Sequence, residues 1–462
     1  MSDATTGAGP LRIAIVGSGP AGFYAAEALF AHPEIDFEVD MIDRLPTPFG
    51  LVRAGVAPDH PKIKNVIRRY EKTAGHEAYR FFGNITVGEA VSAEELASLY
   101  DAVVWAYGAS ADRKLGIEGE DLPGSHAATE FVAWYNGHPD FADRDFDLSC
   151  ERAVVIGNGN VAADVARMLL LPRDELESTD TADIAIEALA NSSIKEVVVL
   201  GRRGPAQAAF TNPEVRELGE LTDAEIVIDP AQVELGPASE AFLESDAADA
   251  TNRKNMATFT ELAGRDRGAK EKSVELRFLR SPVAIGGAER VESIELAVNE
   301  LQLVDDAVRP TDTGERETVE CGLVLRSIGY LGTGIDGIPY DSRRGVIPND
   351  SGRVLDDDEP LAGHYVVGWI KRGPSGVIGT NKKDAAETIE ALCEDVAEGR
   401  LTAGDTDHDA LERLLTERGV EHVHYDGWRA IDALEVSRGE PFGRPRRKLT
   451  ALEDLVDAAR ND

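Results

Sequence analysis

The chain has 462 residues, enough for two or three domains, and its content of 42% hydrophobic and 29% charged residues is typical of a globular protein. Its 84 acidic and 48 basic residues give a net charge of −36, which argues against nucleic acid or an anionic membrane surface as a partner. Cys150, Cys321 and Cys393 are too far apart in sequence to form a CxxC redox pair, a zinc cluster or a cysteine-held iron–sulfur cluster.

The first ten residues, MSDATTGAGP, lack the basic segment followed by an apolar one that marks an export signal. The apolar runs, such as Leu11–Val16 and Val197–Leu200, are far shorter than the ~18 residues of a membrane span. We therefore expect a cytoplasmic protein with no integral membrane segment, and no metal site.

The first motif is an apolar strand at Leu11–Val16, a glycine loop and a helix that continues through Phe23–Phe30. The loop residues Gly17, Gly19, Pro20, Ala21 and Gly22 carry the dinucleotide fingerprint GxGxxG, whose glycines let the backbone approach a pyrophosphate at a helix N-terminus. The next strand, Phe37–Ile42, runs into Asp43, whose carboxylate can accept from both ribose hydroxyls and repels a 2′-phosphate. This loop therefore suits FAD or NAD and not NADP; the alternative is a βα turn whose glycines serve only packing.

A second motif of the same kind begins at Ala153–Ile156 and continues through Gly157-Asn-Gly-Asn-Val161, with Ala162 in place of the third glycine. After its helix, the strand Ile194–Leu200 runs into Arg202 and Arg203. Two guanidinium groups at this position can bind a 2′-phosphate through charge-assisted hydrogen bonds, so this unit suits NADP. The alternative is a solvated strand end.

Further strands place the domain boundaries. Asp101–Gly108 and Gly322–Gly329 are short apolar runs that end in glycine, and Tyr365–Trp369 is expected to be the last strand of the first unit. We therefore predict an α/β fold with two Rossmann-like, three-layer domains, in which an NADP-binding domain at 109–325 interrupts an FAD-binding domain at 1–108 and 326–462. The last part also carries a C-terminal extension.

Smaller elements are predicted around these units. Within the inserted domain, three alternating runs suggest an antiparallel meander: Glu225–Ile228, Val274–Leu279 and Val291–Ala297. The polar segments 238–250 and 304–318 are expected to be surface loops. A helix over Ala385–Glu398 opens the tail, which ends in a proline- and arginine-rich stretch and an amphipathic helix.

Four longer motifs carry a resemblance to a known family: Leu45–Arg53 with Ala54–Pro61, Gly157–Val161, Gly201–Pro205, and Gly368–Asn381. Together they resemble the adrenodoxin reductase-type ferredoxin–NADP⁺ reductases, above all the actinobacterial members, from Leu11 to about Lys383. The resemblance implies a glutathione-reductase-like pair of domains, non-covalent FAD, NADP(H) and an iron–sulfur protein as redox partner.

The resemblance also implies the site residues. FAD contacts would come from Gly17, Gly19, Pro20, Ala21, Gly22, Asp43, Leu51, Val87, Trp369, Gly376, Val377 and Ile378. NADP contacts would come from Arg113, Asn158, Gly159, Asn160, Val161, Arg202, Arg203, Glu214 and Gly376. Asp43 replaces the longer Glu of many relatives.

His60, paired with Glu217, is the candidate polar group near the flavin, with a role in proton balance or in placing the nicotinamide. The alternative is that His60, between Pro58 and Pro61, caps a turn and only packs.

The expected function is that of a ferredoxin–NADP⁺ reductase, which transfers hydride from NADPH to FAD and then single electrons to a ferredoxin-type iron–sulfur protein. Because that partner is usually acidic, docking needs a local basic patch, formed either by Arg438, Arg444, Arg446, Arg447 and Lys448 or by Arg216, Arg253 and Lys254. Two alternatives stay open: an NADPH-oxidising flavoprotein that supplies another acceptor, and a redox sensor that binds FAD and NADP(H) without turnover. The small subunit of glutamate synthase is an example of such an NADPH-oxidising flavoprotein, but it carries cysteine clusters that this sequence lacks.

Overall fold

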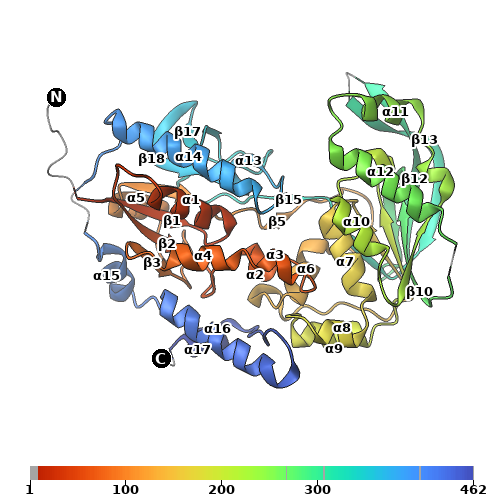
Figure 1. Ribbon diagram of the computed structural model, residues 1–462, viewed down its shortest axis with the longest axis horizontal. Helices are drawn as coiled ribbons and strands as arrows, with labels where there is room; N and C mark the ends of the chain where they lie inside the picture. The colour runs from red at the N-terminus through yellow and green to blue at the C-terminus, as the bar shows by residue number, and fades with distance from the viewer. Residues whose placement is uncertain (1–8, 267, 305–306, 405–406, 461–462) are drawn as a thin grey trace. The chain divides into compact units, whose positions relative to one another are not determined.

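The computed structural model describes residues 9–266, 268–304, 307–404 and 407–460 (Figure 1). The chain forms two compact units. Unit 1 comprises Met1–Val56, His60–Asp112 and Gly329–Asp462, and unit 2 comprises Ala57–Asp59 and Arg113–Ile328. The corresponding divisions predicted from the sequence lie after residues 108 and 325.

Unit 1 is built on a seven-stranded sheet in the order β16-β17-β18-β4-β1-β2-β3. Its strands are β1 (Leu11–Val16), β2 (Phe37–Ile42), β3 (Tyr79–Phe82), β4 (Ala102–Trp105), β16 (Asn349–Asp350), β17 (Arg353–Asp356) and β18 (Glu359–Val366). The strands β3, β2, β1, β4 and β18 are parallel, while β16 and β17 form an antiparallel edge. Every residue of β1 is buried, as expected for a central parallel strand, and its sequence is apolar except for Arg12, which pairs with the buried Asp40 at 3.3 Å.

The helices of unit 1 cover this sheet and form the C-terminal extension. They are α1 (Pro20–Phe30), α2 (Leu51–Ala54), α3 (Pro61–Lys64), α4 (Ile67–Ala74), α5 (Ala93–Leu99), α13 (Trp369–Arg372), α14 (Thr380–Ala397), α15 (Ala410–Glu417), α16 (Tyr425–Gly439) with the 3-10 turn η4 (Glu440–Phe442), and α17 (Leu452–Ala459). The N-terminal α1 packs against α14, and α16 packs against α17 (Figure 1). The two-stranded pair β5 (Ala111–Asp112) and β15 (Tyr330–Leu331) lies where the chain leaves and re-enters unit 1.

Unit 2 is built on a six-stranded parallel sheet in the order β6-β14-β7-β8-β10-β9. Its strands are β6 (Ser125–Ala127), β7 (Arg152–Ile156), β8 (Glu196–Leu200), β9 (Ala224–Ile228), β10 (Lys272–Arg277) and β14 (Leu323–Arg326). A separate antiparallel sheet contains β11 (Arg280–Gly286), β12 (Ser293–Val304) and β13 (Ala307–Glu320). Its helices and 3-10 turns are α6 (Ala128–Tyr135), η1 (Pro139–Phe141), α7 (Asn160–Leu170), α8 (Arg173–Glu177), α9 (Asp183–Ala190), η2 (Pro205–Gln207), α10 (Asn212–Leu218), η3 (Pro230–Val233), α11 (Pro237–Glu244) and α12 (Ala250–Ala263).

The α/β class with two Rossmann-like domains is confirmed, and two smaller predictions are wrong. The runs at Glu225–Ile228 and Val274–Leu279 belong to β9 and β10 of the parallel sheet, so only β12 of the three predicted strands lies in the antiparallel meander. The expected loops 238–250 and 304–318 contain α11 and β13 instead, apart from residues 305–306, which lie outside the described residues. In the described part of the chain, no helix combines the length and apolar character needed to cross a membrane.

Candidate functional site

The first glycine loop connects β1 to α1 in unit 1. Gly17 has φ +110°, and a Cβ there would lie 2.6 Å from the Ala106 carbonyl oxygen. A Cβ on Gly22 would lie 2.1 Å from the Gly17 oxygen. Both positions therefore require glycine for the turn and for the close approach of helix to strand.

Gly19 differs from these two glycines. It is the N-cap of α1 with φ −77° and ψ −175°, a conformation open to any residue, and a Cβ there would meet no atom within 4 Å. Pro20 is the first helical residue and has no N–H, whereas Ala21 and Gly22 carry first-turn amides that have no carbonyl partner inside the helix. Open space over a helix N-terminus fits a pyrophosphate, which the amides and the helix dipole would hold.

Asp43 anchors this loop from the end of β2. Its Oδ2 accepts hydrogen bonds from the Ser18 amide at 2.7 Å and the Ser18 hydroxyl at 2.6 Å, and its Oδ1 accepts from the Leu45 amide at 2.9 Å. An ionised carboxylate has about four acceptor positions, so one remains for a ribose hydroxyl. Asp43 thus fixes the loop backbone as well as offering a sugar contact.

The segment before α2 contacts the first glycine loop. The Phe49 amide donates to the Ser18 oxygen at 2.9 Å, and Phe49 itself has φ +84°, which is unusual for a bulky residue. A Cβ on Gly50 would lie 2.9 Å from Gly19 Cα. The predicted contact residue Leu51, 38% exposed, follows at the start of α2. Sequence reasoning missed Phe49 and Gly50, although they lie within the Leu45–Arg53 motif.

The Gly368–Asn381 motif also reaches the start of α1. A Cβ on Gly368, which has φ +78°, would lie 2.5 Å from Ala21 Cβ, and the Gly368 amide donates to the buried Asp384 carboxylate at 2.5 Å. Trp369 begins α13, with its ring 5.3 Å from that of Tyr330. The structure therefore brings Ala21 and the Gly368–Trp369 turn together; Asp384 was missed because its role depends on the fold.

The other predicted flavin contacts lie further along unit 1. Gly376 has φ +81°, and Val377, 57% exposed, donates its amide to the Thr380 hydroxyl at 3.1 Å. Ile378 packs against the core cluster that also contains Ala21. Val87 packs against a different core cluster, on the other face of the sheet.

The second glycine loop connects β7 to α7 in unit 2. A Cβ on Gly157, which has φ +132°, would lie 2.1 Å from the Ser327 oxygen. Gly159 is the N-cap of α7, and a Cβ there would meet only Ala209 Cβ, at 3.9 Å. The Asn158 carbonyl accepts from the Ala209 amide at 2.9 Å. This loop therefore repeats the first one, with a rigid turn and open space over a helix N-terminus.

Asn160 and Val161 form the first turn of α7. The Asn160 Oδ1 accepts from the Thr211 amide at 2.7 Å, which ties the loop to the start of α10, and Val161 packs against the core of unit 2. Arg113 is the first residue of the long segment of unit 2 and is half-buried.

Arg202 and Arg203 follow β8, the former exposed and the latter half-buried. Within the described ranges, neither guanidinium makes an ion pair, although the chain carries 84 acidic residues. Burial and the neighbouring charge of Arg202 lower the pKa of Arg203. Two adjacent cations without an acid partner form a site for a dianion such as a phosphate.

Glu214 and Glu217 belong to a different cluster in unit 2. Arg167, 3% exposed, donates to Asp59 at 2.8 Å, to Asp164 at 2.8 Å and to the buried Glu214 at 3.0 Å, and lies 3.8 Å from Glu217. Glu214 is therefore held by an arginine of its own chain. Sequence reasoning missed Arg167, because nothing in a helix sequence shows which distant carboxylates it meets.

His60 lies at the N-cap of α3 in unit 1, whereas Glu217 lies on α10 in unit 2. The His60 carbonyl accepts from the Ile63 amide at 3.1 Å, but the ring makes no capping hydrogen bond. His60 therefore occupies the capping position that the alternative interpretation predicts, but its side chain does not cap the helix.

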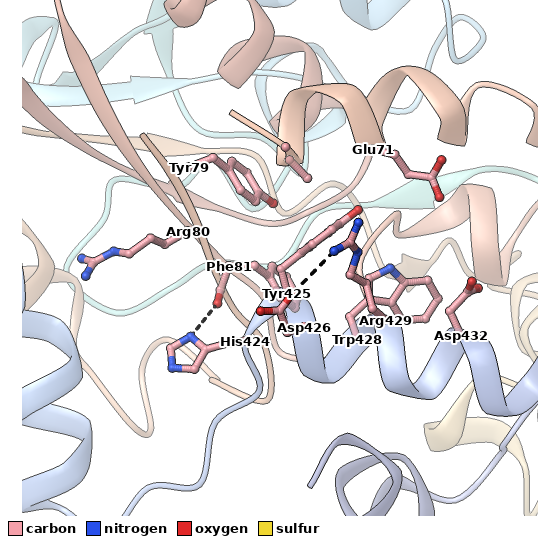
Figure 2. Close-up of a pocket in the computed structure, with 12 residues that line it drawn as sticks. Glu71, Tyr79, Arg80, Phe81, His424, Tyr425, Asp426, Trp428, Arg429 and Asp432 are labelled. Atoms are coloured by element: carbon pink, nitrogen blue, oxygen red, sulfur yellow. Dashed lines mark hydrogen bonds and ion pairs between the residues drawn. The ribbon is translucent and has the colours of Figure 1, made fainter. Parts of the chain in front are cut away.

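A hollow of about 690 Å³ lies elsewhere on unit 1, between α4, β3 and α16 (Figure 2). Polar and aromatic side chains line it, among them Glu71, Arg80, His424, Tyr425 and Asp432. None of the predicted site residues lines this hollow.

The basic C-terminal stretch is largely structural, so the first docking hypothesis is wrong for most of its residues. Arg444 and Lys448 are 8% and 9% exposed. Arg446 pairs with Asp432 at 2.5 Å and with Glu435 at 3.3 Å, and the Arg447 guanidinium stacks over Phe442. These cations hold the extension together rather than forming a free patch.

The chain is similar over nearly its whole length to proteins of known activity. The NADPH-ferredoxin reductase FprA of Mycobacterium leprae is 49% identical over 452 residues, which cover 96% of this chain and 97% of that protein. The mitochondrial NADPH:adrenodoxin oxidoreductase of Salvelinus fontinalis is 42% identical over 475 residues, with 100% and 93% covered.

A family model and a solved structure agree with these relatives. The model for pyridine nucleotide-disulphide oxidoreductases matches residues 11–203. The structure of Mycobacterium tuberculosis FprA in complex with NADPH matches with a TM-score of 0.92 and 47% identity, over 98% of this chain and 100% of that chain.

Proposed function

The chain belongs to the adrenodoxin reductase-type ferredoxin–NADP⁺ reductases, and from that premise we propose that it oxidises NADPH through FAD and reduces a ferredoxin-type iron–sulfur protein. One observation carries this proposal beyond the family relationship. The described residues include two glycine loops over helix N-termini; the first is followed by a carboxylate, and the second by two adjacent arginines that make no ion pair with any described residue. One site thus suits FAD and the other NADP(H).

In unit 1, the first turn of α1 would hold the FAD pyrophosphate and Asp43 the adenosine ribose. Bound FAD takes a hydride and passes its electrons on one at a time, which joins a two-electron donor to a one-electron carrier. We expect Leu51, Val87, Trp369, Gly376, Val377 and Ile378 to surround the rest of the cofactor. Gly376 and Val377 are both exposed, so this stretch is open to a ligand.

In unit 2, the start of α7 would hold the NADP pyrophosphate through the backbone at Asn158, Gly159, Asn160 and Val161. Arg202 and Arg203 would bind the 2′-phosphate and so select NADPH over NADH. Arg113, Glu214 and Gly376 are proposed as further contacts. The remaining task of the protein is to hold nicotinamide and flavin within reach of each other, which is a problem of positioning rather than of acid–base chemistry.

Substituting Ala for Gly19 or for Gly159, the two N-cap glycines, tests the FAD site and the NADP site independently. Because a Cβ on Gly19 meets no atom within 4 Å, Gly19→Ala should leave the unfolding free energy of the apoprotein within about 1 kcal/mol of wild type while lowering FAD affinity by about 100-fold or more. Gly159→Ala should keep the flavin and raise the KM for NADPH by a similar factor. Flavin content, FAD titration and steady-state kinetics measure both effects.

Gly236, the N-cap of α11, provides the control, because a Cβ there also meets no atom within 4 Å and no cofactor is proposed there. Gly236→Ala should affect neither flavin content nor the KM for NADPH. Full flavin occupancy in Gly19→Ala would show that the first loop serves only packing and would reject the FAD site.

We propose that His60 and Glu217 act in proton balance or in placing the nicotinamide. Replacing His60 by Ala should change the rate of flavin reduction by NADPH, or the NADPH affinity, by about tenfold or more. Stopped-flow absorbance under anaerobic conditions gives both quantities, and Glu217→Gln should act in the same direction. Unchanged rate and affinity in both variants would assign His60 to packing alone.

An acidic electron acceptor needs an exposed basic patch on which to dock. With the C-terminal stretch structural, Arg216, Arg253 and Lys254 on the neighbouring helices α10 and α12 are the remaining candidate docking cations, and all three are exposed. Asn212 ties these helices together through Asn255 and Thr258. A sensor without turnover, the alternative function, would need no such exposed cations.

A further inference from the structure

Three potential metal ligands meet on unit 1 outside the proposed cofactor sites. Glu412 on α15 and His422 and His424 on the following segment each offer one ligand atom, and these atoms lie within 4.8 Å of one another. His424 Nε2 is 3.4 Å from Glu412 Oε1, and the two imidazole rings meet edge-on with centroids 4.8 Å apart. From the sequence we expected no metal site.

The backbone explains why the two histidines face the same way. Val423 pairs with Gly83 in an antiparallel bridge, with hydrogen bonds of 2.8 and 2.9 Å, so residues 422–424 are extended. In an extended chain, side chains two residues apart lie on one side. The buried Leu411 and Leu415 anchor α15, which brings Glu412 to that same side.

Hydrogen bonds also set the histidine tautomers. His422 Nδ1 lies 3.2 Å from the Val420 carbonyl oxygen and His424 Nδ1 lies 3.3 Å from the Phe81 carbonyl oxygen, the latter contact being drawn in Figure 2. Because a carbonyl oxygen can only accept, each Nδ1 carries the proton and each Nε2 of a neutral ring presents its lone pair. A backbone carbonyl at the second ring nitrogen is the usual arrangement around metal-bound histidines.

The local surroundings favour a cation at this point. In the neutral tautomer, the His424 Nε2 lone pair and the Glu412 carboxylate oxygen face each other at 3.4 Å, so two electron-pair donors share one space. Around a tetrahedral ion with bonds of about 2.0–2.1 Å, neighbouring ligand atoms are roughly 3.3–3.4 Å apart. The fully buried Phe82 ring lies 5.9 Å from His422 and 5.2 Å from His424, which gives the group an apolar backing.

We propose that Glu412, His422 and His424 form a binding site for a divalent transition-metal ion of the zinc class. Two imidazoles and one carboxylate are a ligand set that zinc uses, with water in the fourth position, and the half-exposed His424 and Glu412 leave that position open to solvent. The ion would join α15 to the segment that pairs with Gly83. Hard cations such as Mg²⁺ are excluded as occupants, because they bind oxygen ligands.

Calorimetric titration of the FAD-loaded chain with ZnCl₂ tests this site, after removal of bound metal by EDTA and in excess Mg²⁺ to saturate the acidic surface. We expect one Zn²⁺ per chain in the wild type. Glu412→Gln, His422→Gln and His424→Gln should each weaken this binding by about 100-fold or more. His76→Gln, at an exposed histidine stacked on Phe30, is the matched control and should bind as wild type.

Circular dichroism and flavin content identify any variant that misfolds, and the half-exposed Glu412 gives a variant that leaves the backbone pairing intact. Zn²⁺ should also raise the Tm of the wild type and of His76→Gln, but not that of Glu412→Gln. The proposal is overturned if the wild type takes up no Zn²⁺ beside Mg²⁺, or if Glu412→Gln binds Zn²⁺ as tightly as wild type; His424 and Glu412 would then form only a surface ion pair.

Discussion

Replacing Arg202 and Arg203 together by Ala is expected to raise the KM for NADPH by about 10²- to 10⁴-fold, at about 1.5–3 kcal/mol for each lost charge-assisted bond. The KM for NADH should stay unchanged, because NADH has no 2′-phosphate. The fold should not suffer, since neither arginine makes an ion pair within the described ranges and each opposes the charge of the other. Steady-state kinetics with both nucleotides and a thermal melt measure these effects.

Arg265→Ala is a suitable control for the arginine pair. Arg265 is a surface cation of unit 2 that pairs with Glu261 at 2.9 Å and lies outside the proposed site. It should leave both nucleotides unaffected. An equal loss of NADPH and NADH turnover in the double variant would mean that the two arginines support the fold and do not bind the 2′-phosphate.

Glu435→Ala is expected to lower the free energy of unfolding by about 3–5 kcal/mol, because it removes the buried carboxylate that pairs with the partly buried Arg53 and accepts from the Leu449 amide. Glu435 is fully buried and binds Arg53 at 2.6 and 2.8 Å, Arg446 at 3.3 Å and the Leu449 amide at 2.9 Å. Arg53 lies on α2, whose N-cap Gly50 approaches Gly19 of the first glycine loop, so this cluster ties the C-terminal extension to the core of unit 1. Chemical denaturation at neutral pH measures the loss, with the exposed Glu440→Ala as control.

The effect of Glu435 should depend on pH in one direction. Burial opposes ionisation, but Arg53 and Arg446 outweigh it and hold the pKa of Glu435 below its ordinary value of 4.5. Its contribution is therefore complete above pH 4.5 and is lost as the pH falls through the lowered pKa of the folded state. The stability difference between wild type and Glu435→Ala should shrink on acidification; a difference below about 1 kcal/mol at neutral pH, or one that grows on acidification, would contradict this role.

The parts of the fold that the sequence predicted are those with a strong local pattern. The apolar strands β1 and β7, each followed by a glycine loop and an alanine-rich helix, could be placed from periodicity alone. The runs that became β9 and β10 were assigned to the wrong sheet, because alternation of side chains does not show which strands pair. β13 was taken for a loop since most of its residues are exposed and polar.

The site residues that could be predicted are likewise those with a local sequence pattern. Asp43 and the pair Arg202–Arg203 stand at strand ends, where the fold brings them to a loop in a predictable manner. The partners of Arg167 and Glu435 come from far along the chain, and so does the approach of Gly368 to Ala21. The arginines and the lysine between 444 and 448 were misread for this reason: a basic run looks solvated until its acidic partners are known.

Anaerobic titration of the purified chain with NADPH and with NADH shows whether FAD in unit 1 is reduced by NADPH held in unit 2. We expect a yellow protein whose flavin is bleached rapidly by NADPH and far more slowly by the same concentration of NADH. A colourless protein that takes up no FAD, or bleaching at equal rates by the two nucleotides, would contradict this expectation.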